Sequence, residues 1–333
     1  KEKNNKKILG MKENHMKQVF TMKEAIKAAK DSLISYSSND ADIPLRTNIN
    51  VKEVGGQSLY MPGYAASSKA LGIKIVSVYP NNINKGLPSV PATMILLDEE
   101  TGQVCAMMDG TYLTRVRTGA VSGAATELLS NEDSSIFAIF GTGGQAETQV
   151  EAVLAVRNIK ELRIYDINIE RAKDFAAKMM EKFNIKCIAV ESSEEAIENA
   201  DIITSVTTTK NPVFDGRLVK KGAHINGVGS YTPEMHEIDE YTVLNAGKVY
   251  VDTRDGVLSE SADLINPIKN NKCTEAIVTG ELGELLLGNT KGRESSDEIT
   301  FFKTVGTAVL DIVTAKMIYI KALELNIGDQ VEM

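Results

Sequence analysis

Apolar positions along the chain follow two periods, and the change between them divides the sequence near residue 110. Before that point, short runs alternate apolar and polar side chains, and most are bounded by Gly, Pro, Asn or Asp, which is typical of strands in a mixed or antiparallel sheet. These runs are RTNINV (46–51), SLYMPGYA (58–65), LGIKIVSVYP (71–80), ATMILLD (92–98) and QVCAMMDG (103–110). An amphipathic helix from 20 to 37, capped by Thr21, is predicted before them.

After residue 110 the period lengthens, and then strands and helices alternate. Residues 111–130 predict a helix with many small side chains, which permit close packing. Strands are expected within 135–140, 161–167, 186–190, 201–208, 219–229 and 246–252, with helices at 145–159, 171–183 and 193–200. This alternation predicts an α/β fold with an open, doubly wound parallel sheet. A final stretch, 297–325, is expected to be one long helical segment.

A glycine-rich turn carries the sharpest chemical signal. The sequence Gly141-Thr142-Gly143-Gly144-Gln145-Ala146 directly follows an apolar strand and directly precedes a helix. Gly141 would allow the tight turn, Gly143 would let a pyrophosphate approach the backbone, and Ala146 would allow close helix packing. The next predicted strand ends at Asp166, where a carboxylate would bind a ribose 2′-hydroxyl and repel a 2′-phosphate. The turn therefore predicts a dinucleotide site that favours NAD over NADP.

Composition and charge exclude several other classes of protein. The formal charge of -8 argues against a nucleic-acid partner, and no apolar run approaches the length of a membrane helix. The three cysteines and three histidines are scattered, which suits reduced thiols in a cytoplasm and predicts no metal site. No signal peptide is visible in this sequence.

Three cations in the first part of the chain are candidates for binding an anionic substrate. Arg46, Lys74 and Arg117 could together hold a carboxylate through charge-assisted hydrogen bonds. Lys74 lies on an alternating strand and could equally point outward, and Arg117 could equally lie on a helix surface. The spacing alone does not show that the three converge.

The chain resembles the ornithine cyclodeaminase/mu-crystallin family over nearly its whole length. The similar segments are PLRTNI, MPGY, LGIKIVSVYPNN, GLPSVPATMILLD, LTRVRTGAVSGAA, IFGTGGQAETQ, HINGVGSYTPEM, VDTRDGVLSES, ELGELLLG and GRESSDEITFFKTVGTAVLDIVTAKMIY. The family includes cyclodeaminases, an archaeal type of alanine dehydrogenase and reductases of cyclic ketimines. The resemblance implies a NAD-binding Rossmann domain (116–304) and an α+β substrate-binding and dimerisation domain built from both chain ends (1–115 with 305–333). It also implies a homodimer.

The resemblance also implies roles for individual residues. Arg46, Lys74 and Arg117 correspond to the carboxylate-binding cations of the family, and Ser89 falls at a substrate-side position. The turn residues from Gly141 to Ala146 and Asp166 match dinucleotide positions. Thr207, Val228 and Gly229 fall at strand ends expected near the nicotinamide.

Two positions depart from the cyclodeaminase pattern. Tyr231 and Leu59 stand where that pattern has an aspartate and a glutamate of the deamination machinery. Asp311 or Glu234 could substitute, although either could equally be an ordinary helix or loop acid.

The departures favour a reaction that consumes the cofactor over one that regenerates it. We therefore expect hydride transfer at the C–N bond of a small amino or cyclic imino acid, by a ketimine reductase or an alanine-type dehydrogenase. Lys74 is the candidate for proton transfer or imine polarisation, with Asp311 as a second catalytic candidate. An ornithine cyclodeaminase using catalytic NAD, and a binding protein that keeps the cofactor without turnover, remain the alternatives.

Overall fold

The computed structural model describes residues 6–333, which form two compact units. The first unit contains residues up to Arg117 together with Thr307–Met333, and the second contains Thr118–Gly306. The boundary near residue 117 falls inside a single helix, α3 (Gly110–Leu129). Residues 1–5 of the expected first domain lie outside the described residues.

The first unit is a mixed sheet with helices packed on it. The strands run in the order β16-β1-β7-β6-β5-β4-β2, with β3 also paired to β4. All described pairs are antiparallel except β1 with β7. The strands are β1 (Lys7–Met11), β2 (Ala41–Asp42), β3 (Thr47–Val51), β4 (Gly56–Ala65), β5 (Ala70–Val78), β6 (Ala92–Leu97), β7 (Val104–Asp109) and β16 (Asp329–Glu332). The mixed sheet expected before residue 110 is therefore confirmed.

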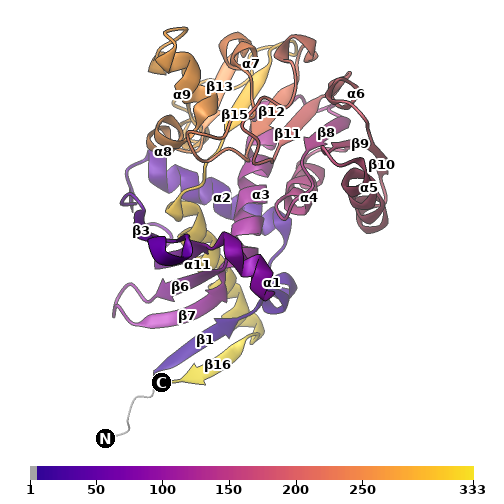
Figure 1. The fold of residues 1–333 in the computed structure, drawn as a ribbon. Coiled ribbons are helices and arrows are strands. Elements are labelled where there is room, and N and C mark those ends of the chain that lie inside the picture. Colours follow the sequence, from indigo (N-terminus) through magenta and orange to yellow (C-terminus); the bar gives the residue numbers. More distant parts are fainter. Residues whose placement is uncertain (1–5) are drawn as a thin grey trace, which may run out of the picture. The chain divides into compact units, whose positions relative to one another are not determined.

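The rest of this core comes from helices α1 (Glu13–Val19), α2 (Met22–Ser37) and α11 (Ala308–Leu325) and from the first residues of α3. Helix α2 begins as predicted, because Thr21 Oγ1 accepts a hydrogen bond from Glu24 N while the Glu24 carboxylate accepts one from Thr21 N. Apolar side chains of α11 share one buried cluster with residues of β4–β6, and α11 also packs against α2. Figure 1 shows α11, in yellow, beside strands from the beginning of the chain.

The second unit is a parallel sheet in the order β10-β9-β8-β11-β12-β15-β13-β14. Its strands are β8 (Ile136–Phe140), β9 (Glu161–Tyr165), β10 (Lys186–Ala189), β11 (Ile202–Ser205), β12 (His224–Gly227), β13 (Lys248–Val251), β14 (Gly280–Glu281) and β15 (Thr300–Lys303). The chain runs outward from β8 to β10 and then returns to β11 on the other side of β8. This reversal is the topological switch point of a Rossmann-type fold, which confirms the predicted fold class.

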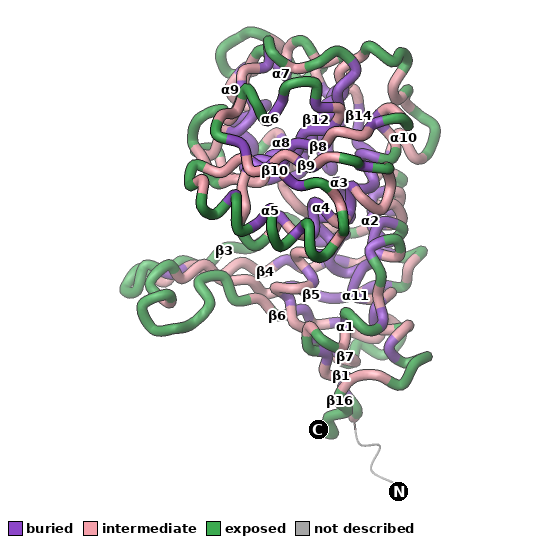
Figure 2. Tube along the Cα trace, turned by 90° about the vertical axis from the view of Figure 1, so that its right-hand side faces the viewer, coloured by how far each residue is buried: buried purple, intermediate pink, exposed green. Residues whose placement is uncertain are grey.

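Helices cover both faces of this sheet. Alternate strand residues pack against α4 (Ala146–Val156) and α5 (Ile169–Phe183) on one face. The others pack against α6 (Ser193–Ile197), α7 (Glu240–Asn245), α8 (Arg254–Glu260) and α9 (Ala262–Lys269), and α10 (Leu282–Leu286) follows β14. In Figure 2 the central strands are accordingly buried and the outer surface of α5 is exposed. The small residues of α3 also do what the sequence predicts, since a Cβ on Gly119 would lie 2.6 Å from the Thr148 carbonyl oxygen.

One predicted element is wrong. The expected helical segment from 297 to 325 is a strand, β15, then a turn, and only then helix α11, which begins at Ala308. The TFFK sequence of β15 is fully buried between two parallel neighbours, β12 and β13. Gly306, with φ 86°, breaks the chain direction before the helix because it adopts a left-handed conformation.

A buried histidine makes the stability of the second unit depend on pH. His224 is fully buried, and its ring nitrogens hydrogen-bond Thr300 Oγ1 and Asn226 Oδ1, both at 2.8 Å. Burial lowers the pKa of His224 from 6.5 to about 3, with the Asn226 hydrogen bond opposing the shift. Below pH 6.5 the unfolded chain therefore binds a proton that the folded chain excludes. The free energy of unfolding consequently decreases as the pH falls from 6.5 toward 3.

Because of His224, we expect the free energy of unfolding to be about 2 kcal/mol smaller at pH 5 than at pH 7. One proton excluded from the folded state changes this free energy by ~1.4 kcal/mol per pH unit. Denaturant unfolding at the two pH values measures the change in free energy for the protein and for His224→Gln, which cannot titrate. The variant should lose that part of the pH dependence. An identical pH dependence in both proteins would show that His224 does not contribute.

Candidate active site

Lys74, Arg117 and Asp311 form a buried charged cluster in the first unit. Lys74 points inward from the middle of β5, Arg117 comes from α3 and Asp311 from the first turn of α11. Asp311 Oδ1 accepts hydrogen bonds from Lys74 Nζ at 3.0 Å and from Arg117 Nε at 2.8 Å. The structure thus brings together two of the three predicted cations and the predicted acid.

The exposed fractions of these side chains show how dry the cluster is: 2% for Lys74, 7% for Arg117 and 0% for Asp311. Buried charges of this kind persist only when they are paired. Two cations share one carboxylate oxygen, so the cluster keeps a net positive charge. Asp311 Oδ2 is buried and has no hydrogen-bond partner in the described protein. The cluster therefore combines an excess positive charge with a desolvated acceptor.

The same surroundings set the protonation of the cluster. Burial lowers the pKa of Lys74 from 10.5 to about 8, the Arg117 and Arg46 charges lower it as well, and Asp311 opposes them. Burial alone would raise the pKa of Asp311, but the Arg117 and Lys74 charges hold it below its usual value. Lys74 is thus a cation at neutral pH that can release its proton slightly above it.

The hydrogen bonds that define the Lys74–Arg117–Asp311 cluster do not include the other predicted residues. Arg46 precedes β3 and is close enough to Lys74 for its charge to affect the lysine. Ser89 is exposed in the segment before β6, where its carbonyl accepts a hydrogen bond from Tyr79 N. Glu234 is exposed in the second unit. Sequence reasoning missed Thr114, whose hydroxyl accepts a hydrogen bond from Lys74 Nζ at 3.2 Å, although it lies one helical turn before Arg117.

The glycine-rich turn lies in the second unit, between β8 and α4. Gly141 has φ 98°, and a Cβ there would lie 2.8 Å from the Val206 carbonyl oxygen, so the tight turn requires glycine. Gly143 is exposed and has open space where a Cβ would be. Asp166 directly follows β9 and accepts a hydrogen bond from Thr142 Oγ1 at 2.8 Å. An open backbone at a helix N-terminus beside a carboxylate fits a dinucleotide.

The remaining predicted cofactor residues follow the two strands on the far side of the switch point. Thr207 lies two residues after β11, and Val228 and Gly229 follow β12 directly. Because β8, β11 and β12 are parallel neighbours, their carboxyl ends meet at one edge of the sheet. Their contact with a cofactor remains a prediction.

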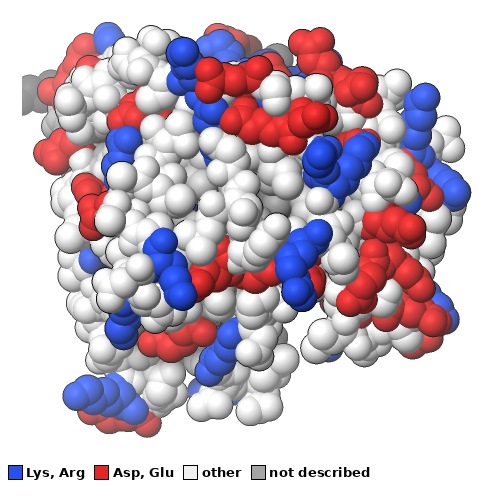
Figure 3. Space-filling model, turned by 90° about the horizontal axis from the view of Figure 1, so that it is seen from above, with Lys and Arg blue, Asp and Glu red and all other residues white. Residues whose placement is uncertain are grey.

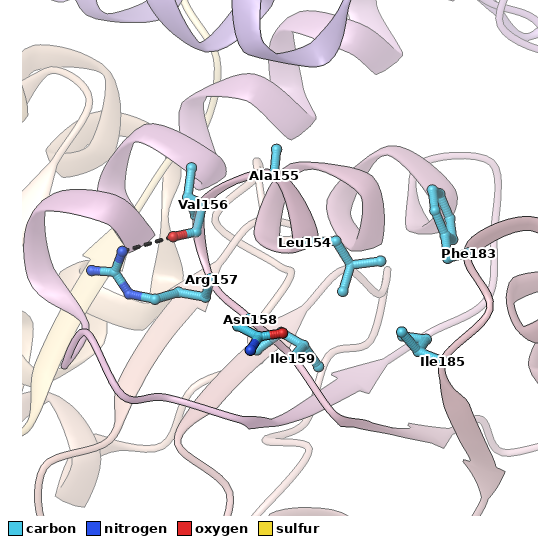
Figure 4. Close-up of a pocket in the computed structure, with 8 residues that line it drawn as sticks. All are labelled: Leu154, Ala155, Val156, Arg157, Asn158, Ile159, Phe183 and Ile185. Atoms are coloured by element: carbon cyan, nitrogen blue, oxygen red, sulfur yellow. Dashed lines mark hydrogen bonds between the residues drawn. The ribbon is translucent and has the colours of Figure 1, made fainter.

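The pocket in Figure 4 lies elsewhere in the second unit. It is lined by the last residues of α4 and α5 and the segments after them, including Leu154, Arg157, Phe183 and Ile185. Arg157 does not offer its guanidinium to a ligand, because it donates to carbonyl oxygens of Val156, Glu127 and Ser130. The pocket is at the opposite end of α4 from the glycine-rich turn, and the predicted site residues do not line it.

Other features of the described residues bear on the classes considered from composition. Cys105, Cys187 and Cys273 are free thiols. Within residues 6–333, His, Cys, Asp and Glu side chains do not form a group of three that could hold a metal ion. Over the same range, each helix is too short or too polar to cross a membrane. On the face shown in Figure 3, lysine and arginine side chains lie among clusters of acidic ones.

The model of the ornithine cyclodeaminase/mu-crystallin family matches residues 6–326. The chain belongs to this family. A family member from Bacillus cereus, named Δ1-pyrroline-2-carboxylate reductase, is 38% identical over 98% of this chain and 100% of its own length. Similar members therefore span both units.

Two solved structures of family members are also similar over nearly their whole length. Thermococcus litoralis Δ1-pyrroline-2-carboxylate reductase, in complex with NADH and L-proline, has a TM-score of 0.92 and 44% identity and covers 97% of this chain and 100% of its own. An archaeal alanine dehydrogenase dimer with bound NAD has a TM-score of 0.90 and 31% identity, covering 98% of this chain and 99% of its own.

Proposed function

We propose that this family member is a NAD-dependent oxidoreductase that reduces the C=N bond of a small cyclic imino acid, with Δ1-pyrroline-2-carboxylate as substrate and L-proline as product. The observation that carries the proposal is the buried Lys74–Asp311–Arg117 cluster, whose excess positive charge suits a carboxylate-bearing substrate. The names of the Bacillus cereus and Thermococcus litoralis relatives support the same substrate.

Arg46 and the three residues of the cluster each have a separate role in the proposed reaction. Arg117 and Arg46 bind the substrate carboxylate and orient it, which lowers the entropic part of the barrier. Lys74 Nζ, protonated at neutral pH, donates a proton to the imine nitrogen. Asp311 keeps Lys74 charged, and its unpaired Oδ2 accepts a hydrogen bond from the resulting N–H. NADH, when bound, supplies the hydride to the α-carbon. This hydride and the proton from Lys74 together complete the reduction of the imine to an amine.

In the second unit, the open backbone at Gly143 and the N-terminus of α4 hold the pyrophosphate, and Asp166 binds the adenosine ribose. Thr207, Val228 and Gly229 lie on the nicotinamide side. The carboxylate of Asp166 would repel a 2′-phosphate, so NAD is preferred over NADP.

Asp166→Ser tests this preference. Loss of one charge-assisted hydrogen bond should raise the KM for NADH by about tenfold or more, while removal of the repulsion lowers the KM for NADPH. Steady-state kinetics with each cofactor measure both values. Asp174→Ser, on the exposed part of α5, should change neither. A preference for NADH that survives in Asp166→Ser would show that another residue sets it.

The alternatives are less well supported than imino acid reduction. In the cyclodeaminase pattern two acids activate and expel the amine, and this chain has Tyr231 and Leu59 at those positions. Of the two acids that could substitute, Asp311 is paired with Lys74 and Arg117, and Glu234 is exposed. A binding protein without turnover has no need for a buried lysine whose pKa is about 8.

Product stoichiometry tests the proposed function. Purified protein is given Δ1-pyrroline-2-carboxylate with NADH, and in parallel L-ornithine with a catalytic amount of NAD. We expect one NADH consumed per L-proline formed in the first reaction and no proline or ammonia in the second. Cyclisation of ornithine without net NADH consumption would make the protein a cyclodeaminase instead.

We also propose that the protein is a homodimer assembled through its first unit. Six large apolar side chains of this unit are exposed in two segments: Leu45, Ile49 and Val54 on β3 and next to it in sequence, and Ile83, Leu87 and Val90 between β5 and β6. Figure 2 shows β3 at an exposed end of the sheet, and exposed apolar surface of this kind is typical of a protein interface. The archaeal alanine dehydrogenase is described as a dimer. Light scattering should give twice the chain mass, and Ile49→Lys should reduce it to a single chain. A monomeric protein would contradict the proposal.

A further inference from the structure

Glu237 joins two turns at the carboxyl edge of the parallel sheet. It lies between β12 and α7 and is fully buried. Its Oε2 accepts hydrogen bonds from Ser205 Oγ, from Thr207 N at 2.8 Å and from Thr207 Oγ1 at 2.8 Å. Its Oε1 accepts one from Ser230 N at 2.7 Å. A single carboxylate thus fixes the end of β11, the turn after it and the turn after β12.

The two turns are in contact around this carboxylate. A Cβ on Gly229 would lie 2.0 Å from the Thr207 carbonyl oxygen and 2.8 Å from Glu237 Oε1. Only glycine can occupy the position without moving the Thr207 backbone. The two turns thus meet beside Glu237, whose carboxylate accepts hydrogen bonds from both of them.

A second buried carboxylate holds the segment that carries Glu237. Asp263 Oδ1, from α9, accepts hydrogen bonds from Glu237 N at 2.8 Å and Ile238 N at 3.1 Å. Its Oδ2 accepts one from Ser230 Oγ at 2.8 Å and lies 3.7 Å from the fully buried Lys303 Nζ. Lys303, at the end of β15, offsets part of the negative charge. Apolar side chains in the same volume would avoid the desolvation cost of these three buried charges. The charged groups are therefore explained better by the positions in which they hold the backbone than by stability.

We propose that Glu237 is a positioning residue for hydride transfer, which holds the turns at Thr207 and Val228–Gly229 in the arrangement that the nicotinamide ring requires. This inference rests on the proposed function, because it takes those turns as the nicotinamide side of the cofactor site. Glu237 does not act on the substrate. A carboxylate is needed because both of its oxygens accept, whereas a glutamine has one acceptor oxygen and would set its NH₂ group against a backbone N–H.

The test compares Glu237→Gln with Asp201→Asn. Asp201 is a matched control: its carboxylate accepts hydrogen bonds from Ser135 N at 2.9 Å and Ile136 N at 3.0 Å, at the amino edge of the same sheet. Two quantities are measured for each protein: the Kd for NADH by fluorescence titration without substrate, and the kinetic isotope effect with 4-deuterated NADH. Thermal unfolding reports the general loss of stability.

We expect Glu237→Gln to raise the Kd for NADH about tenfold, which corresponds to one lost charge-assisted hydrogen bond, and to increase the isotope effect because hydride transfer becomes slower. Asp201→Asn should lower the melting temperature and leave both quantities unchanged. If Glu237→Gln does not fold, Ser205→Ala removes one donor to the carboxylate and should shift both quantities in the same direction by a smaller factor.

A folded Glu237→Gln with the Kd and isotope effect of the unmodified protein would overturn the inference, as would equal changes in Asp201→Asn. When only Ser205→Ala is folded, unchanged values in that variant overturn it. Failure of the proposed function is seen separately, because it appears as absent imino acid reduction in the unmodified protein.

Discussion

Replacing Lys74 by methionine is expected to lower kcat/KM for imino acid reduction by about 10²–10⁴-fold, the range for loss of a positioned proton donor. Methionine fills the buried volume but cannot donate a proton. The unmodified enzyme should also lose activity as the pH rises through about 8, because the donor must be protonated and the pKa of Lys74 is about 8. Initial rates from pH 6 to pH 10 measure both effects.

The control for this variant is Lys23→Met, on the exposed part of α2, which should keep the full rate and the same pH profile. Lys74→Arg separates charge from proton donation, since an arginine stays protonated over the whole range. Lys74→Arg should bind substrate and react slowly, and its rate should not decrease as the pH rises through about 8. An alkaline loss that persists in both Lys74 variants would assign the titrating group elsewhere.

Replacing Asp311 by asparagine is expected to have the second large effect, on stability and on the pH profile together. The change removes the carboxylate charge that the two buried cations share, and breaking a buried pair costs ~3–5 kcal/mol. Asp311 also raises the pKa of Lys74, so its loss should move the alkaline limb of the rate to lower pH. Denaturant unfolding and the pH–rate profile of Asp311→Asn measure the two consequences.

A matched control is Asp31→Asn, whose carboxylate pairs with Lys27 on an exposed part of α2. A surface pair of this kind contributes ~0–1 kcal/mol, so this variant should be close to the unmodified protein. If Asp311→Asn left the alkaline limb in place, the carboxylate would not control the protonation of Lys74.

Local patterns predicted much of the fold. The glycine-rich turn, the apolar run of β8 and the Thr21 cap each depend on neighbouring residues, and each was identified from sequence. Strands β1 and β16 were missed because they pair with each other, with Lys7 opposite Glu332, and nothing local marks them. The sequence of β15 predicts helix instead of strand because the strand is short, apolar at its centre and followed closely by α11.

The candidate site was also predicted only where local sequence was informative. Lys74 and Arg117 were identified as cations in notable places, but sequence left open whether Lys74 points inward. Asp311 is 237 residues from Lys74, so their pairing is purely tertiary. Glu237 was not singled out, because it is one of several acids in a loop and only its four hydrogen bonds distinguish it.

The most direct test of the proposed reaction follows the hydride itself. The protein is given Δ1-pyrroline-2-carboxylate and NADH carrying deuterium at the transferred position of C4, and the L-proline formed is examined by mass spectrometry and NMR. We predict one deuterium per proline, located on the α-carbon. Unlabelled proline, or no proline while the protein is folded and binds NADH, would contradict the account.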